Sequence, residues 1–242
     1  MFATPQFTEA AATLRPRLGD LLHWNELQGE SKTFVQNFIR QKFVDVTPIY
    51  RGLLVLSAGA FEQFVRRLIR DSVVFVNTSA ARFDEVPEKL RKENVRRTGQ
   101  ALATVFEPSD YLALDYDDLG KNIGTCLAGA QTFKLNADAF AIYVSTVSPR
   151  NLAEVLGRVG FELRWDDFGK SDALRGLFHL KNTKETANRL EEELGAFIAN
   201  RNRIAHSGGG GLSVTATDVE QVIQLLKLFS QELGSQLKNH LK

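Results

Sequence analysis

The spacing of apolar residues along the chain predicts helices over most of its length. Thr47-Pro48 and Ser148-Pro149 each precede apolar residues at helical spacing, and Pro87 precedes a charged segment with the same spacing. Alternating apolar and polar positions are few, and only Gly160–Trp165 could form a short strand or, equally, an extended loop. The pattern therefore predicts an all-α fold with at most one short β element.

Two consecutive helices are predicted near the C-terminus. The first runs from about residue 184 to residue 205 and stops at His206-Ser207, before the glycines Gly208–Gly211. Thr217–Glu220 matches a capping box and predicts the start of the second helix, which continues to about residue 241. We expect the two helices to form a hairpin. Together with a helix over about 47–77 they would form the core of one domain, residues 1–242, with a helical insertion over about 80–180.

The composition limits the cellular compartment in which the protein can be expected and the kinds of partner that it can be expected to bind. The 242 residues are 43% hydrophobic, and 30 basic against 29 acidic residues give a formal charge of +1, so any RNA contact has to be local. The single cysteine, Cys126, favours a reducing compartment. Met1–Pro5 does not begin a signal sequence, and no stretch has the roughly 20 apolar residues that span a bilayer. We expect a cytoplasmic protein that does not contact membranes.

Arg201 stands on the apolar stripe of the first C-terminal helix, three residues after Ile198 and seven after Leu194. A partly buried arginine needs acceptors, unless its stem extends and leaves the charge in water. Glu62 interrupts the apolar stripe of the helix after Pro48 in the same way. If the two helices pack together, Glu62 could accept a bidentate hydrogen bond from Arg201.

His206 is four residues after Asn202, at the predicted helix end. The negative end of the helix dipole favours a protonated imidazole there, which suits proton exchange near neutral pH. A histidine at this place could also simply cap the last carbonyl groups.

The six residues Arg201–His206, RNRIAH, resemble the motif of the HEPN superfamily: an arginine, a polar residue, three further residues and a histidine at a helix end. The stretch Arg51–Glu62 resembles an early helix of larger bacterial HEPN families, including the RiboL-PSP type. The segment over about 80–180 resembles nothing that we can place.

The resemblance implies a metal-independent endoribonuclease with Arg201 and His206 as the catalytic pair and Asn202 as the orienting residue. Cleavage by the ribose 2′-hydroxyl needs a base, an acid and a cation near the phosphorus. Because one histidine cannot easily serve oxygens on opposite sides of the phosphorus, the resemblance also implies a homodimer with a composite site.

Other cations could hold RNA phosphates. They are Arg203 and a basic stretch with interleaved glutamates, in which the candidates are Lys89, Arg91, Lys92, Arg96 and Arg97. A run of this kind is more often a solvated face whose charges pair along the helix. Phe161, Trp165 and Phe168 could stack on bases, but their spacing favours a place in the core.

No motif implies a metal or a cofactor. The four histidines form no zinc pattern, and the glycine run lacks the following Lys-Ser or Lys-Thr of a phosphate-binding loop. Two function classes remain. One is a ribonuclease, with the role of a toxin or defence effector and with an antitoxin or defence-system protein as partner. The other is a catalytically silent HEPN module for RNA binding or protein assembly.

Overall fold

The computed structural model describes residues 47–105, 114–129, 132–142, 144, 147–207 and 212–241. Within these ranges the chain forms helices and no strand, which confirms the all-α prediction. The elements in chain order are α3 (Thr47–Ser79), the 3₁₀ helix η1 (Phe83–Glu85), α4 (Glu88–Leu102), α5 (Tyr116–Leu127), α6 (Ala137–Ala141), α7 (Pro149–Gly157), α8 (Trp165–Gly169), α9 (Asp172–Phe178), α10 (Thr183–Ser207) and α11 (Ala216–His240).

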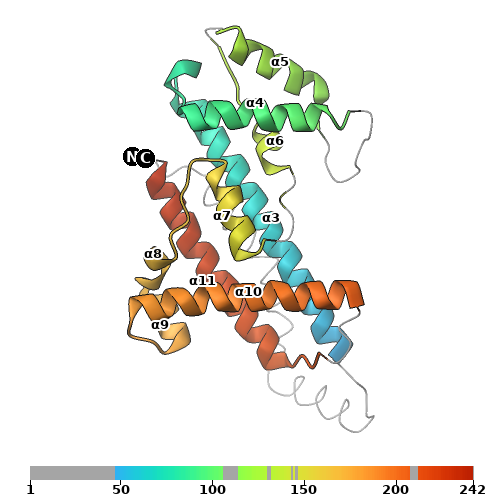
Figure 1. Cartoon of the computed structure of the whole chain (residues 1–242), viewed down its shortest axis with the longest axis vertical. Helices are drawn as coiled ribbons and strands as arrows, with labels where there is room; N and C mark the ends of the chain where they lie inside the picture. Colours follow the sequence, from blue (N-terminus) through green and yellow to red (C-terminus); the bar gives the residue numbers. More distant parts are fainter. Residues whose placement is uncertain are drawn as a thin grey trace, which may run out of the picture.

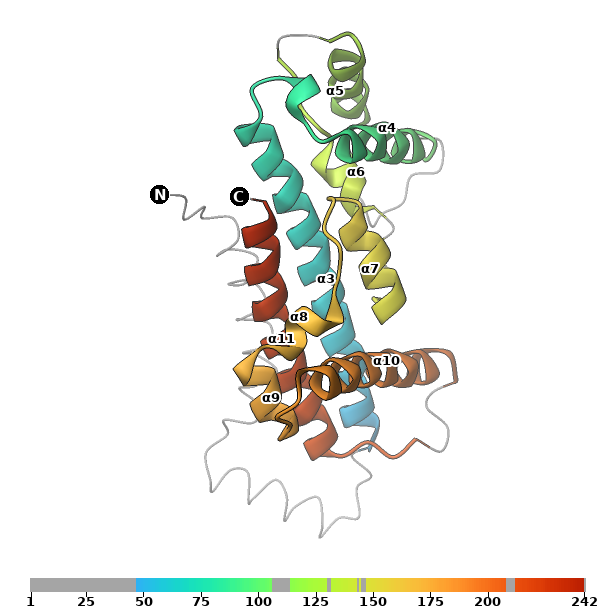
Figure 2. The same cartoon turned by 60° about the vertical axis from the view of Figure 1, so that its left-hand side comes forward.

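The other helices are arranged around α3, whose 33 residues make a rod about 50 Å long. α11 runs beside α3, α10 crosses its N-terminal half, and α4, α5 and α6 gather at its C-terminal end (Figures 1 and 2). The buried face of α3 includes Leu54, Ala58, Phe61, Val65 and Ile69, which recur at helical spacing. This face makes α3 the common support of both ends of the molecule.

Aromatic rings join α3, α8 and α11 in the main core. The ring of Phe229 lies 5.9 Å from Phe61, 5.0 Å from Phe168 and 6.0 Å from Trp165, measured between centroids. Phe168 is fully buried, Phe161 is 7% exposed, and Trp165 packs against the same cluster. The three aromatic residues that the sequence offered as stacking surfaces for bases are therefore part of the core.

The segment over about 80–180 contributes to this core as well. Val86, Leu90 and Leu152 belong to the main cluster. A separate small cluster joins α4, α5 and the region of α6; its members are Ala101, Leu119, Ala139 and Ile142. That the whole chain is one domain with this segment as an insertion stays a prediction, which the residues that the segment contributes to the main cluster support.

Most predicted helix starts agree with the structure. Thr47 and Pro48 begin α3, and the Ser148 hydroxyl caps α7 by accepting a hydrogen bond of 3.3 Å from the Asn151 backbone N–H. Pro87 is the cap of α4 rather than its first residue. The Gly160–Trp165 stretch forms no strand: residues 161–164 are an irregular connection and Trp165 begins α8.

The capping box of the last helix is two residues earlier than predicted. Thr215, not Thr217, is the cap: its hydroxyl accepts from the Asp218 backbone N–H, and the Asp218 carboxylate accepts from the Thr215 N–H at 2.8 Å. With this start Val214 and Val219, both buried, flank the first turn as a hydrophobic staple. A start at Thr217 would give up that arrangement.

The predicted hairpin of α10 and α11 is wrong. The two helices cross, and each packs on α3, α8 and α9 instead of along the other (Figures 1 and 2). The apolar faces of α10 and α11 point at these shared neighbours. Each helix therefore packs against other elements and not against the helix that is next to it in the sequence. The glycine run that was expected to make the turn, Gly208–Gly211, lies outside the described residues.

Candidate functional site

α10 carries the sequence motif in its last turns. The helix begins where the Asn182 side chain accepts hydrogen bonds from the backbone N–H groups of Lys184 (2.8 Å) and Glu185 (3.1 Å). The buried residues Leu194 and Ile198 then hold one face of the helix against its neighbours. Residues 201–207 continue that helix, so the backbone that presents the motif is regular up to its end.

Arg201 and Glu62 meet where α10 crosses α3. The Nη2 of Arg201 lies 4.0 Å from the Oε1 of Glu62, and their side chains are 24% and 13% exposed. At this distance the charges attract each other without sharing a hydrogen bond. The structure thus brings the two side chains together, but the bidentate hydrogen bond expected from the sequence is not formed.

The guanidinium is oriented by Asn202 instead. Its Nη1 donates a hydrogen bond of 3.1 Å to the Asn202 Oδ1. The Nε of Arg201 is covered and finds no hydrogen-bond partner among the described residues. An unsatisfied buried donor costs stability, and in native proteins such groups are often found where function requires them. Arg201 is therefore held in place at an energetic cost.

His206 is exposed, next to the last residue of α10, and Asn202 is half-buried. Four residues separate the two, so they lie about 40° apart around the helix, whereas Arg201 and His206 lie about 140° apart. Around the helix Asn202 lies between Arg201 and His206, and its side chain accepts the hydrogen bond from the guanidinium. Arg203 is exposed, and its carbonyl accepts the Ser207 hydroxyl at 2.6 Å.

Arg51 supports the same region, and sequence reasoning did not single it out. Its Nε donates a hydrogen bond of 3.0 Å to the Leu212 carbonyl, and its Nη2 donates to the same oxygen. This contact ties the segment before α11 to the start of α3. Arg51 and Glu62 are eleven residues apart and so lie about 20° apart around the helix. Two charged residues with that spacing are a signal that could have marked the side of α3 on which α10 lies.

The basic stretch lies elsewhere. α4 sits at the C-terminal end of α3, far from the end of α10 (Figures 1 and 2). Lys89, Lys92 and Arg96 are exposed there; Lys92 pairs with Glu88 at 2.6 Å and Arg96 with Glu93 at 3.3 Å. These pairs fit the solvated face that the interleaved glutamates suggested.

The other two arginines of α4 are less accessible. Arg91 is half-buried, with its guanidinium carbon 5.9 Å from the ring centroid of Phe83. Arg97 is only 5% exposed, and its Nε donates to Glu93 at 2.9 Å. Arg97 is therefore not the exposed cation that the sequence predicted, because Glu93 one turn earlier draws it inward.

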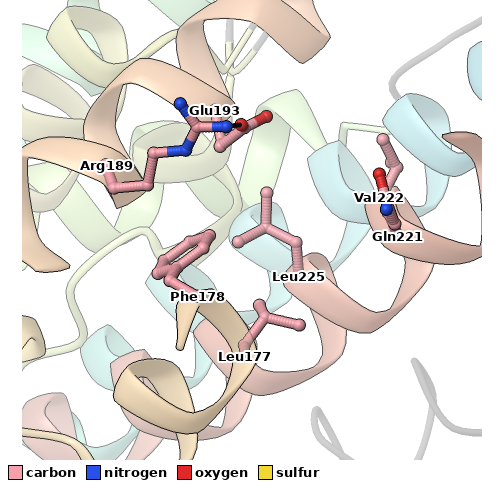
Figure 3. A pocket seen from close by; sticks show the side chains of 7 residues that line it. All are labelled: Leu177, Phe178, Arg189, Glu193, Gln221, Val222 and Leu225. Atoms are coloured by element: carbon pink, nitrogen blue, oxygen red, sulfur yellow. Dashed lines mark ion pairs between the residues drawn. The ribbon is translucent and has the colours of Figure 1, made fainter. Parts of the chain in front are cut away.

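The described pockets do not contain the motif. One has a volume of about 240 Å³ between α9, α10 and α11, with an ion pair of Arg189 and Glu193 at one edge (Figure 3). Its lining residues are Leu177, Phe178, Arg189, Glu193, Gln221, Val222 and Leu225. A second, polar pocket of about 230 Å³ lies between α3, α5 and the start of α6. Neither includes Arg201, Asn202 or His206.

Cysteine and metal chemistry are the alternatives to consider among the described residues. Burial raises the pKa of the Cys126 thiol, which disfavours the nucleophilic thiolate. In the part of the chain that the structure describes, no three His, Cys, Asp or Glu side chains gather as a metal site would require. In the same part, no helix is both long and apolar enough to cross a bilayer.

A helical fold in which a long helix ends with Arg201, Asn202 and His206 defines a HEPN-type domain. The family model described as RiboL-PSP-HEPN matches residues 17–239, and the chain belongs to this family. No curated protein and no solved structure matches the chain. HEPN domains often bind RNA and dimerise, so membership points to a function related to RNA.

Proposed function

We propose that the protein is a metal-independent endoribonuclease that acts at a composite site built from two copies of the chain. The observation that carries the proposal is the arrangement of Arg201, which lies 4.0 Å from Glu62 and donates a hydrogen bond to Asn202, in the same last turns of α10 as the exposed His206.

The chemistry needs only groups that the motif contains. An imidazole takes the proton of the ribose 2′-hydroxyl, the 2′-oxygen attacks phosphorus, and the bond from phosphorus to the 5′-oxygen breaks. A second, protonated imidazole gives its proton to the leaving 5′-oxygen. The products are a 2′,3′-cyclic phosphate and a free 5′-hydroxyl. Arg201 would stabilise the negative charge that develops on the phosphoryl oxygens.

Two copies are required because the attacking and leaving oxygens lie on opposite sides of the phosphorus. Each chain offers one exposed imidazole at the end of α10. With α10 helices of two protomers facing each other, one His206 can act as base and the other as acid. The same pairing would place an Arg201 guanidinium on either side of the phosphate.

The exposed face of α3 supports this assembly and offers a surface for the second copy. Ile49 and Leu56, seven residues apart, are 49% and 60% exposed. Gly52 and Gly59 lie on the same face with open space in front of them, which allows close approach of another helix. Glu62 follows Gly59 by about 60° around the helix, so the stripe borders the Arg201 pair.

We propose the role of a toxin or defence effector in the cytoplasm, with an antitoxin or defence-system protein as a further partner. A second function, a catalytically silent module for RNA binding or protein assembly, has one observation in its favour. The two pockets of about 240 and 230 Å³ that the described residues line do not include Arg201, Asn202 or His206.

The test compares the wild type with His206→Ala and Arg201→Ala on structured and single-stranded RNA in excess EDTA. We expect cleavage by the wild type with 2′,3′-cyclic phosphate ends, and a loss of at least about 100-fold in each variant. His240→Ala and Arg189→Ala are matched controls: both residues are exposed, and His240 lies at the far end of α11. The controls should cleave like the wild type.

Cleavage that persists in His206→Ala would refute the proposed mechanism. If none of the proteins cleaves RNA but all bind it, the silent binding module is the better function. If none binds RNA, protein assembly becomes the better function, and partners should be sought by pull-down.

A further inference from the structure

Two arginines of the segment over about 80–180 are buried, yet both point at one exposed carboxylate. Arg97 belongs to α4, Arg158 caps the end of α7, and each is 5% exposed. The Nη2 atoms of Arg97 and Arg158 lie 3.6 Å and 3.8 Å from the same oxygen of Glu154, whose side chain is 66% exposed. The two guanidinium groups thus converge on one point at the surface.

Each arginine is held by the protein through at least one of its other nitrogens. The Nη1 of Arg158 donates to the carbonyls of Phe140 (3.0 Å) and Ile142 (2.8 Å) at the end of α6. The Nε of Arg97 donates to Glu93 at 2.9 Å, and its Nη1 donates to Gln100 at 3.1 Å. Both guanidinium groups are therefore fixed before any ligand arrives, which lowers the entropic cost of binding.

Glu154 does not provide hydrogen bonds to the Nη2 atoms of the two arginines. Both Nη2 distances exceed hydrogen-bond length, and neither Nη2 makes a hydrogen bond to the described residues. The two positive charges lie close together and are mostly out of water. Burial, and then the charge of Arg97, therefore lower the pKa of Arg158 to about 10. Two fixed guanidinium groups that share a single carboxylate oxygen match a phosphate, which offers more oxygens and more charge.

We propose that Arg97 and Arg158 form a phosphate-binding site, and that Glu154 occupies its mouth until a phosphate group displaces it. Exposed Lys89 and Arg96 flank the site; the Lys89 Nζ reaches to within 3.9 Å of the position where a Cβ at Gly157 of α7 would lie. Assignment of the phosphate to an RNA backbone rests on the proposed function. The site lies at the α4 end of α3, so it would hold RNA away from the cleavage motif (Figure 1).

The decisive variant is Glu154→Gln, which removes the competing charge and keeps the size of the side chain. Glu162→Gln is the matched control, because Glu162 is exposed and pairs with the exposed Arg164 at 2.8 Å. Both changes are made in the His206→Ala background, so that binding is measured without cleavage. The probes are inorganic phosphate and a labelled single-stranded RNA of mixed sequence, each at constant ionic strength.

We expect Glu154→Gln to bind both probes about fivefold more tightly than the control, the effect of one charge about 4 Å away in a largely aqueous setting. Tighter binding of phosphate alone would overturn the assignment to RNA and leave a site for a small phosphate ester. Binding of both probes equal to that of the control would overturn the site itself.

Two further measurements keep the proposal testable if the variant is unstable or if the protein does not cleave RNA. If Glu154→Gln destabilises the fold, the His206→Ala protein with Glu154 intact still decides the matter: phosphate should raise its Tm above that in chloride, and no rise would refute the site. If the nuclease proposal fails because no RNA is cut, tighter binding by Glu154→Gln would still establish the phosphate site. The two proposals therefore fail separately.

Discussion

The pair of Arg201 and Glu62 allows a quantitative test of the site. A double-mutant cycle with Glu62→Gln, Arg201→Gln and the double variant isolates the energy of this pair from the other contacts of each residue. Two unit charges 4 Å apart interact by about 1 kcal/mol in water and about 4 kcal/mol at an effective dielectric constant of 20. Because the pair is mostly buried and lies 4.0 Å apart, we expect a coupling free energy of about 2 kcal/mol.

The same helix offers a matched control pair. Arg189 and Glu193 are one turn apart on α10 and closer to each other, at 2.5 Å, but their side chains are 54% and 37% exposed. Water screens such a pair, so the cycle Arg189→Gln with Glu193→Gln should give about 0.5 kcal/mol or less. Burial, rather than distance, is expected to decide which pair couples more strongly.

The assay is equilibrium unfolding in urea at one fixed protein concentration, because a dimer would make the stability depend on concentration. The variants should change the unfolding midpoint without a change in the m-value. A coupling energy for Glu62 and Arg201 no larger than that of the surface pair would refute the reasoning. Arg201 would then be a solvated cation, and Glu62 would not hold its guanidinium in place.

Three further predictions concern the fold and the assembly. Thr215→Ala should lower the free energy of unfolding by about 1 kcal/mol, and Thr217→Ala should leave it nearly unchanged in the same urea titration. Leu56→Glu should shift the protein from dimer to monomer in sedimentation equilibrium, whereas Leu127→Glu, at a leucine that is also exposed, should not. Cys126, with its raised pKa, should react with iodoacetamide at pH 8 at least about 100-fold more slowly in the folded protein than in urea; equal rates would contradict its burial.

Local patterns were sufficient for much of the secondary structure and for the motif. Thr47-Pro48 and Ser148-Pro149 mark true helix starts because capping and the fixed φ of proline act within a few residues. Arg201 and Glu62 could be selected as a pair because each breaks an apolar stripe. The distance between them could not, since it depends on how α10 crosses α3, and residues far apart in the sequence set that crossing.

The cap of α11 shows where local patterns reach their limit. Thr215 and Thr217 are each followed by a carboxylate three residues later, so both match the local rule. The choice depends on Val214, which is buried only because the tertiary core receives it next to Val219. The sequence thus contained two acceptable starts, and packing selected one.

The amino-acid sequence alone determined the all-α class, the main helices and the family motif at the end of α10, because helical periodicity and capping depend on near neighbours. Only the tertiary structure decided that α10 and α11 cross, that Arg97 is buried, and that Arg158 joins it at Glu154. The burial of a charged side chain depends on acceptors from other elements, such as the carbonyls of Phe140 and Ile142, and no local pattern contains them.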